Sequence, residues 1–154
     1  MIRRGFFTLW LLAAPVAAAA GEPAMPADAT RAFEMAYAAS FYEFDACGDG
    51  ISGRNYRRAL SEKVAHCPFP ADVKQRFVQR AAAQRLKSAQ AMAKLIEDNG
   101  GLPVRLDGMS RTCREQSETP EYQAIRARLD DFASGKIAAD RVVPGACDAV
   151  EISP

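Results

Sequence analysis

The feature of this sequence that most constrains its fold is a set of four cysteines, Cys47, Cys67, Cys113 and Cys147. They follow an N-terminal segment typical of exported proteins, and an even number of cysteines in an exported chain indicates disulfide bonds. Four cysteines allow three pairings. Short loops are the easiest to close, so neighbouring cysteines are expected to pair. The expected bridges are Cys47–Cys67 and Cys113–Cys147, each restricting the unfolded chain by about 3 kcal/mol.

The spacing of the cysteines argues against their other common uses. The sequence has no C-x-x-C pair, so a thioredoxin-like redox centre or a zinc knuckle is not expected. Covalent haem attachment needs C-x-x-C-H. His66 is the only histidine, so one chain cannot build a multi-histidine site, and a catalytic triad would have to use this residue. A position near the end of a helix, where the helix dipole favours it, is its simpler explanation. We therefore expect no metal and no cofactor.

The N-terminal residues indicate export. Arg3 and Arg4 precede an apolar stretch over residues 6–14, Pro15 interrupts it, and small residues follow at 18–20. This order predicts a signal peptide over 1–20 and a single mature domain over 21–154, in the periplasm or secreted. The apolar stretch is shorter than the ~20 residues that span a bilayer. An uncleaved membrane anchor is the alternative, and no later segment is apolar enough to cross a membrane.

Helical periodicity dominates the rest of the chain, and no alternating strand pattern is present. Apolar residues recur at three- and four-residue spacing, and Pro, Gly and capping residues bound the segments. The expected helices cover about 28–46, 55–65 with Asn55 as N-cap, 70–98 and 120–135. Residues 102–118 are expected to form a loop with a short helical turn around Cys113, and the tail from 137 an irregular segment. The fold class is therefore all-α: a small antiparallel bundle of about four helices stapled by two disulfides.

Charge is distributed unevenly along a nearly neutral chain. Residues 54–94 contain ten basic and two acidic side chains, between two mildly acidic segments. On the expected 70–98 helix, four cations lie within about 40° of one another: Arg76, Arg80, Lys87 and Lys94. We expect this basic helix face to contact solvent or an anionic partner. Arg85 falls instead on the apolar arc with Phe77 and Leu95, where its stem could be buried or its head could pair with Glu43.

The stretch DACGDGISGRNY, residues 45–56, invites comparison with a calcium-binding loop. Such a loop needs oxygen ligands at positions 1, 3, 5 and 12 and Gly at position 6. Asp45, Asp49 and Gly50 fit positions 1, 5 and 6, whereas Cys47 at position 3 and Tyr56 at position 12 do not. The stretch is therefore expected to be a glycine-rich hinge between two helices, with solvated aspartates. A weak cation site is the alternative.

Paired carboxylates are the other possible catalytic feature. Glu43, Asp45 and Asp49 flank the glycine-rich stretch and could serve a cell-wall hydrolase. Acidic residues near a helix end and a turn are common for solvation alone, and no larger motif supports catalysis. We therefore expect that the protein is not an enzyme.

Two short motifs resemble a known family. CGDGISG, followed by CPFPADVKQRFV, resembles the type VI secretion amidase immunity (Tai) family. The matching residues are Cys47, Gly50, Ile51, Gly53, Cys67, Pro68, Val73 and Gln75. The match covers about 30 of 154 residues, and the family's aromatic turn residue is replaced by Asp49-Gly50. The resemblance implies a small, exported, helical protein that binds a cell-wall amidase, and it implies no functional residues.

Taken together, these patterns favour a protein that acts by binding. The expected partner is a protein or another anionic component of the envelope, docked by the basic helix face. Nucleic acid is disfavoured by the export signal and the near-neutral charge. An immunity protein against an amidase and a peptidoglycan hydrolase that uses the 43–49 carboxylates are the alternatives.

Overall fold

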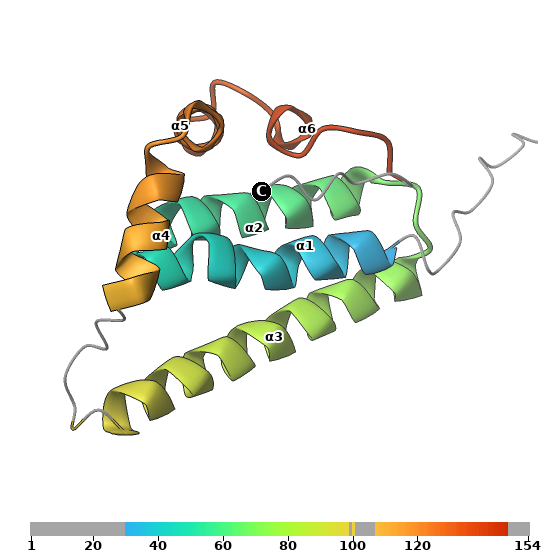
Figure 1. The fold of residues 1–154 in the computed structure, drawn as a ribbon. Helices are drawn as coiled ribbons and strands as arrows, with labels where there is room; N and C mark the ends of the chain where they lie inside the picture. The colour runs from blue at the N-terminus through green and yellow to red at the C-terminus, as the bar shows by residue number, and fades with distance from the viewer. Residues whose placement is uncertain (1–29, 99, 101–106, 148–154) are drawn as a thin grey trace, which may run out of the picture.

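The computed structural model describes residues 30–98, 100 and 107–147, and it confirms an all-α fold, with no strand among these residues (Figure 1). The expected signal peptide lies outside the described residues. The helices are α1 (Thr30–Glu43), the 3₁₀-helix η2 (Asp45–Cys47), α2 (Gly50–His66), α3 (Ala71–Asp98), α4 (Asp107–Ser117), α5 (Pro120–Ala133) and α6 (Ala139–Val142). Of these helices, none combines the length and the apolar character that a membrane crossing requires.

An antiparallel pair of helices, α1 and α2, forms the centre of the molecule (Figure 1). The apolar stripes of both helices are buried, as the periodicity predicts. They comprise Phe33, Ala36 and Tyr37 of α1, with Phe44 just past its end, beside Tyr56, Ala59, Leu60 and Val64 of α2. α3 covers one side of this pair, and α5 and α6 lie across α2 on the other. Burying each large side chain contributes about 1.5–3 kcal/mol, so these contacts hold the layers together.

The turn between α1 and α2 is shorter than the sequence predicts. α2 begins at Gly50, five residues before the expected cap Asn55, and the carboxylate of Asp49 accepts a hydrogen bond from the Ser52 N–H at 3.3 Å. Asp is as good an N-cap as Asn. Residues 50–53 are therefore the first turn of a helix, not part of a hinge. Only Gly48 of this stretch uses a positive φ, at 81°.

The disulfides join different cysteines from those expected. Cys47 pairs with Cys113 and Cys67 with Cys147, with Cα atoms 5.2 and 5.7 Å apart. The expected pairing is wrong because Cys47 and Cys67 flank opposite ends of α2, whose 17 residues extend about 25 Å. A bridge needs Cα atoms within about 7 Å. The observed bridges span 66 and 80 residues, and by the same loop-entropy estimate each restricts the unfolded chain by about 4 kcal/mol.

A helix that the sequence did not predict, α4, covers most of the segment expected to be a loop. Its sequence, DGMSRTCREQS, has only two apolar side chains, Met109 and Cys113, and helices of 11 residues are marginal without tertiary contacts. α4 instead contacts η2 and α5, and the Cys47–Cys113 bridge joins it to η2. The disulfide and these tertiary contacts therefore stabilise α4, and its own sequence pattern does not indicate a helix.

The C-terminal segment is held in place by a buried lysine on α2. The Lys63 side chain is only 4% exposed, and its Nζ donates to the carbonyl oxygens of Val143, at 2.6 Å, and Gly145. Asp140 lies 3.7 Å from the same nitrogen. A buried ammonium needs such partners. The segment that was expected to be irregular therefore contains α6 and packs against α2, and Cys147 bridges to Cys67 just beyond it.

The long helix α3 is buried in its first part only. Its 28 residues extend about 42 Å, twice the length of the 14-residue α1. Val73 and Phe77 are buried, whereas no residue of α3 from Val78 to Asp98 is. In Figure 1, α3 crosses below α1 and runs away from it toward its yellow C-terminal end. The apolar arc that the sequence predicts along this helix is therefore covered in its first part and open in its second.

Candidate functional site

The first acidic candidate near the α1–α2 turn, Asp45, neutralises a buried arginine. One carboxylate oxygen lies 3.0 Å from a guanidinium nitrogen of Arg57 on α2, and Arg57 is 7% exposed. The guanidinium also donates to the Ser40 hydroxyl at 3.0 Å and lies 4.1 Å above the ring of Phe41. The expectation of a solvated Asp45 is therefore wrong, because a buried guanidinium requires a counter-charge.

The second acidic candidate, Asp49, joins the start of α2 to α5. Besides capping α2, its carboxylate accepts a hydrogen bond from the Tyr122 hydroxyl at 3.0 Å and lies 3.2 Å from Nε of Arg126. Burial, together with the hydrogen bond to the charged Asp49, raises the pKa of Tyr122 to about 12. Asp49 is thus a structural acceptor as well, and the expectation that it is solvated is also wrong.

The third acidic candidate, Glu43, has no ion-pair partner among the described residues, unlike the other two. Its carboxylate makes no hydrogen bond or ion pair with any described residue, and partial burial raises its pKa. Burial and the charge of Glu43 raise the pKa of the nearby Tyr56 to about 12. Of the three carboxylates, Asp45 and Asp49 are therefore engaged by arginines, and Glu43 is not engaged by any described arginine. The described residues include no cluster of three acidic, Cys or His side chains suited to a metal ion.

His66 lies at the end of α2, where the sequence places it. The ring is exposed, and Nδ1 lies 2.7 Å from the carbonyl oxygen of Glu62 one turn earlier. This is a local contact at a helix end, and it involves no other candidate residue.

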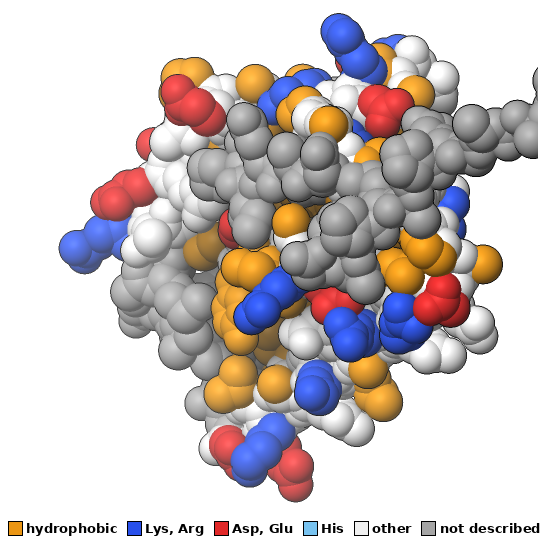
Figure 2. Space-filling view, turned by 90° about the vertical axis from the view of Figure 1, so that its right-hand side faces the viewer, with side chains coloured by type: hydrophobic (Ala, Val, Ile, Leu, Met, Phe, Trp, Pro, Cys, Tyr) orange, Lys and Arg blue, Asp and Glu red, His pale blue; other side chains and the backbone are white. Residues whose placement is uncertain are grey.

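The predicted basic face of α3 is exposed along its length: Arg76, Arg80, Lys87 and Lys94. Three of these cations make ion pairs, Arg76 with Asp72, Arg80 with Glu34 and Lys94 with Asp98. Figure 2 shows the arrangement, with blue side chains over the lower part of the molecule, where α3 lies, and red ones beside several of them. Exposed pairs of this kind contribute about 0–1 kcal/mol, so they add little to the stability of the fold.

Arg85 and Lys87 differ from these three cations because they make no ion pair with any described residue. Arg85 lies on the apolar arc of α3, as the sequence predicts, but it is exposed, and it does not pair with Glu43. The reason is that no described helix covers α3 at this point. Around Arg85 and Lys87, α3 also exposes apolar side chains: Leu86 at 60%, Met92 at 44%, Leu95 at 48% and Ile96 at 37%.

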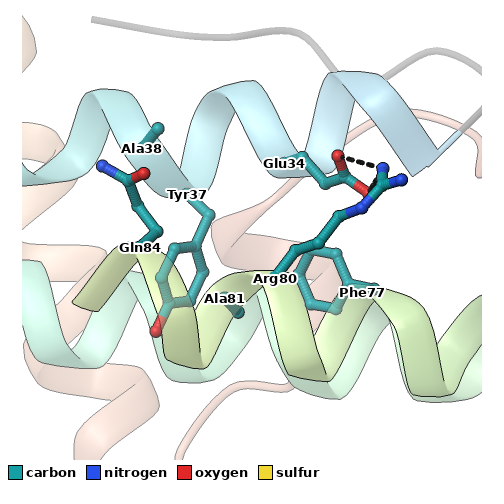
Figure 3. A pocket seen from close by; sticks show the side chains of 7 residues that line it. All are labelled: Glu34, Tyr37, Ala38, Phe77, Arg80, Ala81 and Gln84. Carbon is teal, nitrogen blue, oxygen red and sulfur yellow. Dashed lines mark hydrogen bonds and ion pairs between the residues drawn. The ribbon is translucent and has the colours of Figure 1, made fainter. Parts of the chain in front are cut away.

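A pocket of about 120 Å³ lies between α1 and α3, where the buried part of α3 meets its exposed part. Its lining residues are Glu34, Tyr37, Ala38, Phe77, Arg80, Ala81 and Gln84. Figure 3 shows that Arg80 and Gln84 reach from α3 toward α1, while Tyr37 reaches from α1 toward α3. The rings of Tyr37 and Phe77 pack edge to face, 6.2 Å apart. Arg80 donates two hydrogen bonds of 2.9 Å to Glu34 at one end of the pocket.

Sequence reasoning missed this pocket, because its aromatic residues belong to regular apolar stripes. The available signal was the presence of alanine on both helices at the contact. Ala38 on α1 and Ala81 on α3 line the pocket from its two walls, and their small side chains leave the space between the helices unfilled. The pairing of these two positions follows only from the packing of α1 against α3.

Comparisons with known proteins give no match: no family model, curated protein or solved structure matches this chain. The local resemblance to the amidase immunity family remains a prediction.

Proposed function

We propose that this protein binds a partner through the exposed part of α3, residues 78–98, and that it does so outside the cytoplasm. The observation that carries the proposal is the combination of exposed apolar side chains with two cations that lack ion pairs, on a stretch of helix in which no residue is buried. Exposed apolar patches of this kind mark interaction sites.

The charge of α3 supports an anionic partner. Residues 73–96 contain six basic side chains and no acidic one. A surface with one sign of charge attracts partners of opposite charge and speeds their association. The two disulfides support the location, because such bonds persist in oxidising compartments such as the periplasm.

The proposal favours binding over catalysis on the basis of the acidic residues. A glycosidase of the kind considered above needs two carboxyl groups that face a substrate. Asp45 and Asp49 are engaged in ion pairs with Arg57 on α2 and Arg126 on α5. Only Glu43 of the three makes no such contact with the described residues.

Charge reversal at the unpaired cations tests the proposal. The double variant Arg85→Glu/Lys87→Glu should lose the partner that wild-type protein captures by crosslinking in the native envelope, with the partner identified by mass spectrometry. Reversing Arg76 or Arg80 instead would also break ion pairs with Asp72 and Glu34.

A matched control exists on α4. Arg111 and Arg114 are also exposed, and their side chains make no ion pair with a described residue. The variant Arg111→Glu/Arg114→Glu changes the net charge equally and should retain the partner. Equal recovery from the two double variants, both folded by circular dichroism, would contradict the proposal.

A further inference from the structure

The pocket between α1 and α3 and the exposed stripe beside it have the form of a helix-binding groove. We propose that they bind an acidic amphipathic helix of a protein partner, which inserts one aliphatic side chain into the pocket. This inference rests on the proposed function and names the chemistry of the partner.

The pocket has the size and lining of an anchor site. Four of its seven lining residues are aromatic or aliphatic, namely Tyr37, Phe77, Ala38 and Ala81, and the other three are the polar Glu34, Arg80 and Gln84. An apolar cavity of about 150 Å³ holds a benzene-sized molecule, so a volume of about 120 Å³ suits one aliphatic side chain. Binding energy at protein interfaces concentrates where such an anchor fills a preformed pocket.

The exposed apolar stripe of α3 continues from this pocket. At 100° per residue, Ser88, Met92 and Leu95 lie in the same direction as Phe77 and Ala81. The distance along the helix from Ala81 to Leu95 is about 21 Å. A partner helix of about four turns, laid along α3, would therefore cover the stripe and reach the pocket. Helices that bind in this way use apolar anchors at three- and four-residue spacing.

The charges select an acidic helix over a second copy of this chain. Arg85 and Lys87 flank the stripe on its two sides, about 60° and 100° from its centre, and neither makes an ion pair with a described residue. Acidic residues beside the apolar anchors of a partner would meet both cations. A second copy of α3 would bring six cations and three carboxylates, Asp72, Glu97 and Asp98, against the same set. The cations are in excess on both copies, and such like-charge contacts are unfavourable.

The direction of the stripe argues for a helix over a lipid surface. An amphipathic helix that binds a membrane turns its apolar face away from the protein body. The stripe on α3 points to the same side as Val73 and Phe77, which pack against the core, and the pocket lies between two helices. A helix can enter such a recess, whereas a flat bilayer contacts outward-facing side chains.

The test uses a synthetic 18-residue helical peptide with leucines at three- and four-residue spacing and glutamates on the flanks. The wild-type protein should bind it, and the same peptide with lysine in place of glutamate should not bind. Filling the pocket from either wall, by Ala81→Leu or Ala38→Leu, should weaken binding about tenfold, as expected for loss of one anchor. The control Ala82→Leu adds the same side chain on the exposed side of α3 and should leave binding unchanged.

Two substitutions from opposite helices guard against a folding artefact, and thermal melting checks each variant. The inference is overturned if the acidic peptide does not bind, if both pocket variants bind it as wild type does, if the basic peptide binds equally well, or if only vesicles of phosphatidylglycerol bind. The proposed function would survive any of these results as long as Arg85→Glu/Lys87→Glu still loses the partner captured in the envelope.

Discussion

Two pairs of cations from the same basic stretch of the sequence have opposite surroundings: Arg57 and Lys63 on α2, and Arg85 and Lys87 on α3. The α2 pair is 7% and 4% exposed, and both side chains donate to acceptors fixed by other parts of the fold. The α3 pair is exposed and makes no ion pair with a described residue. The difference follows from position, because α2 has α1 on one side and α5 and α6 on the other, whereas this part of α3 has no such cover.

Burial determines what each pair contributes. Removing a charged group from water costs several kcal/mol, which only well-placed partners offset. The buried cations therefore hold segments in place: Arg57 holds η2 through Asp45, and Lys63 holds the C-terminal segment through its carbonyls. The exposed cations contribute little to folding.

Substitution by methionine should separate the two pairs by their effect on stability. Arg57→Met and Lys63→Met should each lower the free energy of unfolding by about 3 kcal/mol, because they leave a carboxylate or two carbonyl oxygens without their donor. The matched variants Arg85→Met and Lys87→Met should change it by less than about 0.5 kcal/mol. Equilibrium unfolding in urea measures all four differences.

A similar loss of unfolding free energy for all four variants would contradict the contrast between the α2 and α3 cations, since the α3 cations would then have structural partners too. A loss below about 1 kcal/mol for Lys63→Met would show that water replaces its ammonium group at the two carbonyls.

The helices of this fold could be predicted from the sequence where an apolar stripe packs on another element. α1 and α5 lie where the periodicity predicts them, and α5 starts at Pro120 as expected, after the N-cap Thr119. α4 could not be predicted, because its contacts and its disulfide, not its own pattern, hold it. The expected cysteine pairing is wrong for a related reason: the rigid helix α2 separates Cys47 from Cys67, so the shortest loop cannot close.

The candidate site shows the same limit. Periodicity placed Phe77 and Leu95 on one face of α3, but it could not show that a neighbouring helix covers only the first of them. It also gave no reason to separate Arg57 and Lys63 from the rest of the basic stretch. Whether a side chain is covered depends on residues distant in sequence, such as Asp45 or Val143, and a single helical pattern contains no information about them.

The buried ion pair between Arg57 and Asp45 depends on the absence of a side chain at Gly53. Adding a single methyl group there tests this. A Cβ at Gly53 would fall on the carboxylate of Asp45, with Arg57 and the Cβ of Phe44 close by. Gly53→Ala should displace Asp45 from Arg57 and lower the free energy of unfolding by about 2 kcal/mol. At Gly50 the added Cβ makes only ordinary contacts, so Gly50→Ala should be neutral or stabilising by up to about 1 kcal/mol. Thermal unfolding of both variants gives the comparison, and equal melting temperatures would refute it.

Burial should also affect the contribution of a carboxylate, Glu43, to stability. This is the smallest of the expected changes in the free energy of unfolding. Burial raises the pKa of Glu43 above its ordinary value of 4.5. A group whose pKa is higher in the folded state favours folding most below its unfolded pKa, and that contribution is lost as the pH rises through the folded pKa. Glu43→Gln should therefore raise the free energy of unfolding at pH 7 by less than about 1 kcal/mol. The melting temperature should rise by a few degrees at most. At pH 4, where Glu43 is protonated, this advantage should vanish. An equal difference at both pH values would mean that the Glu43 carboxylate has a partner that offsets its burial.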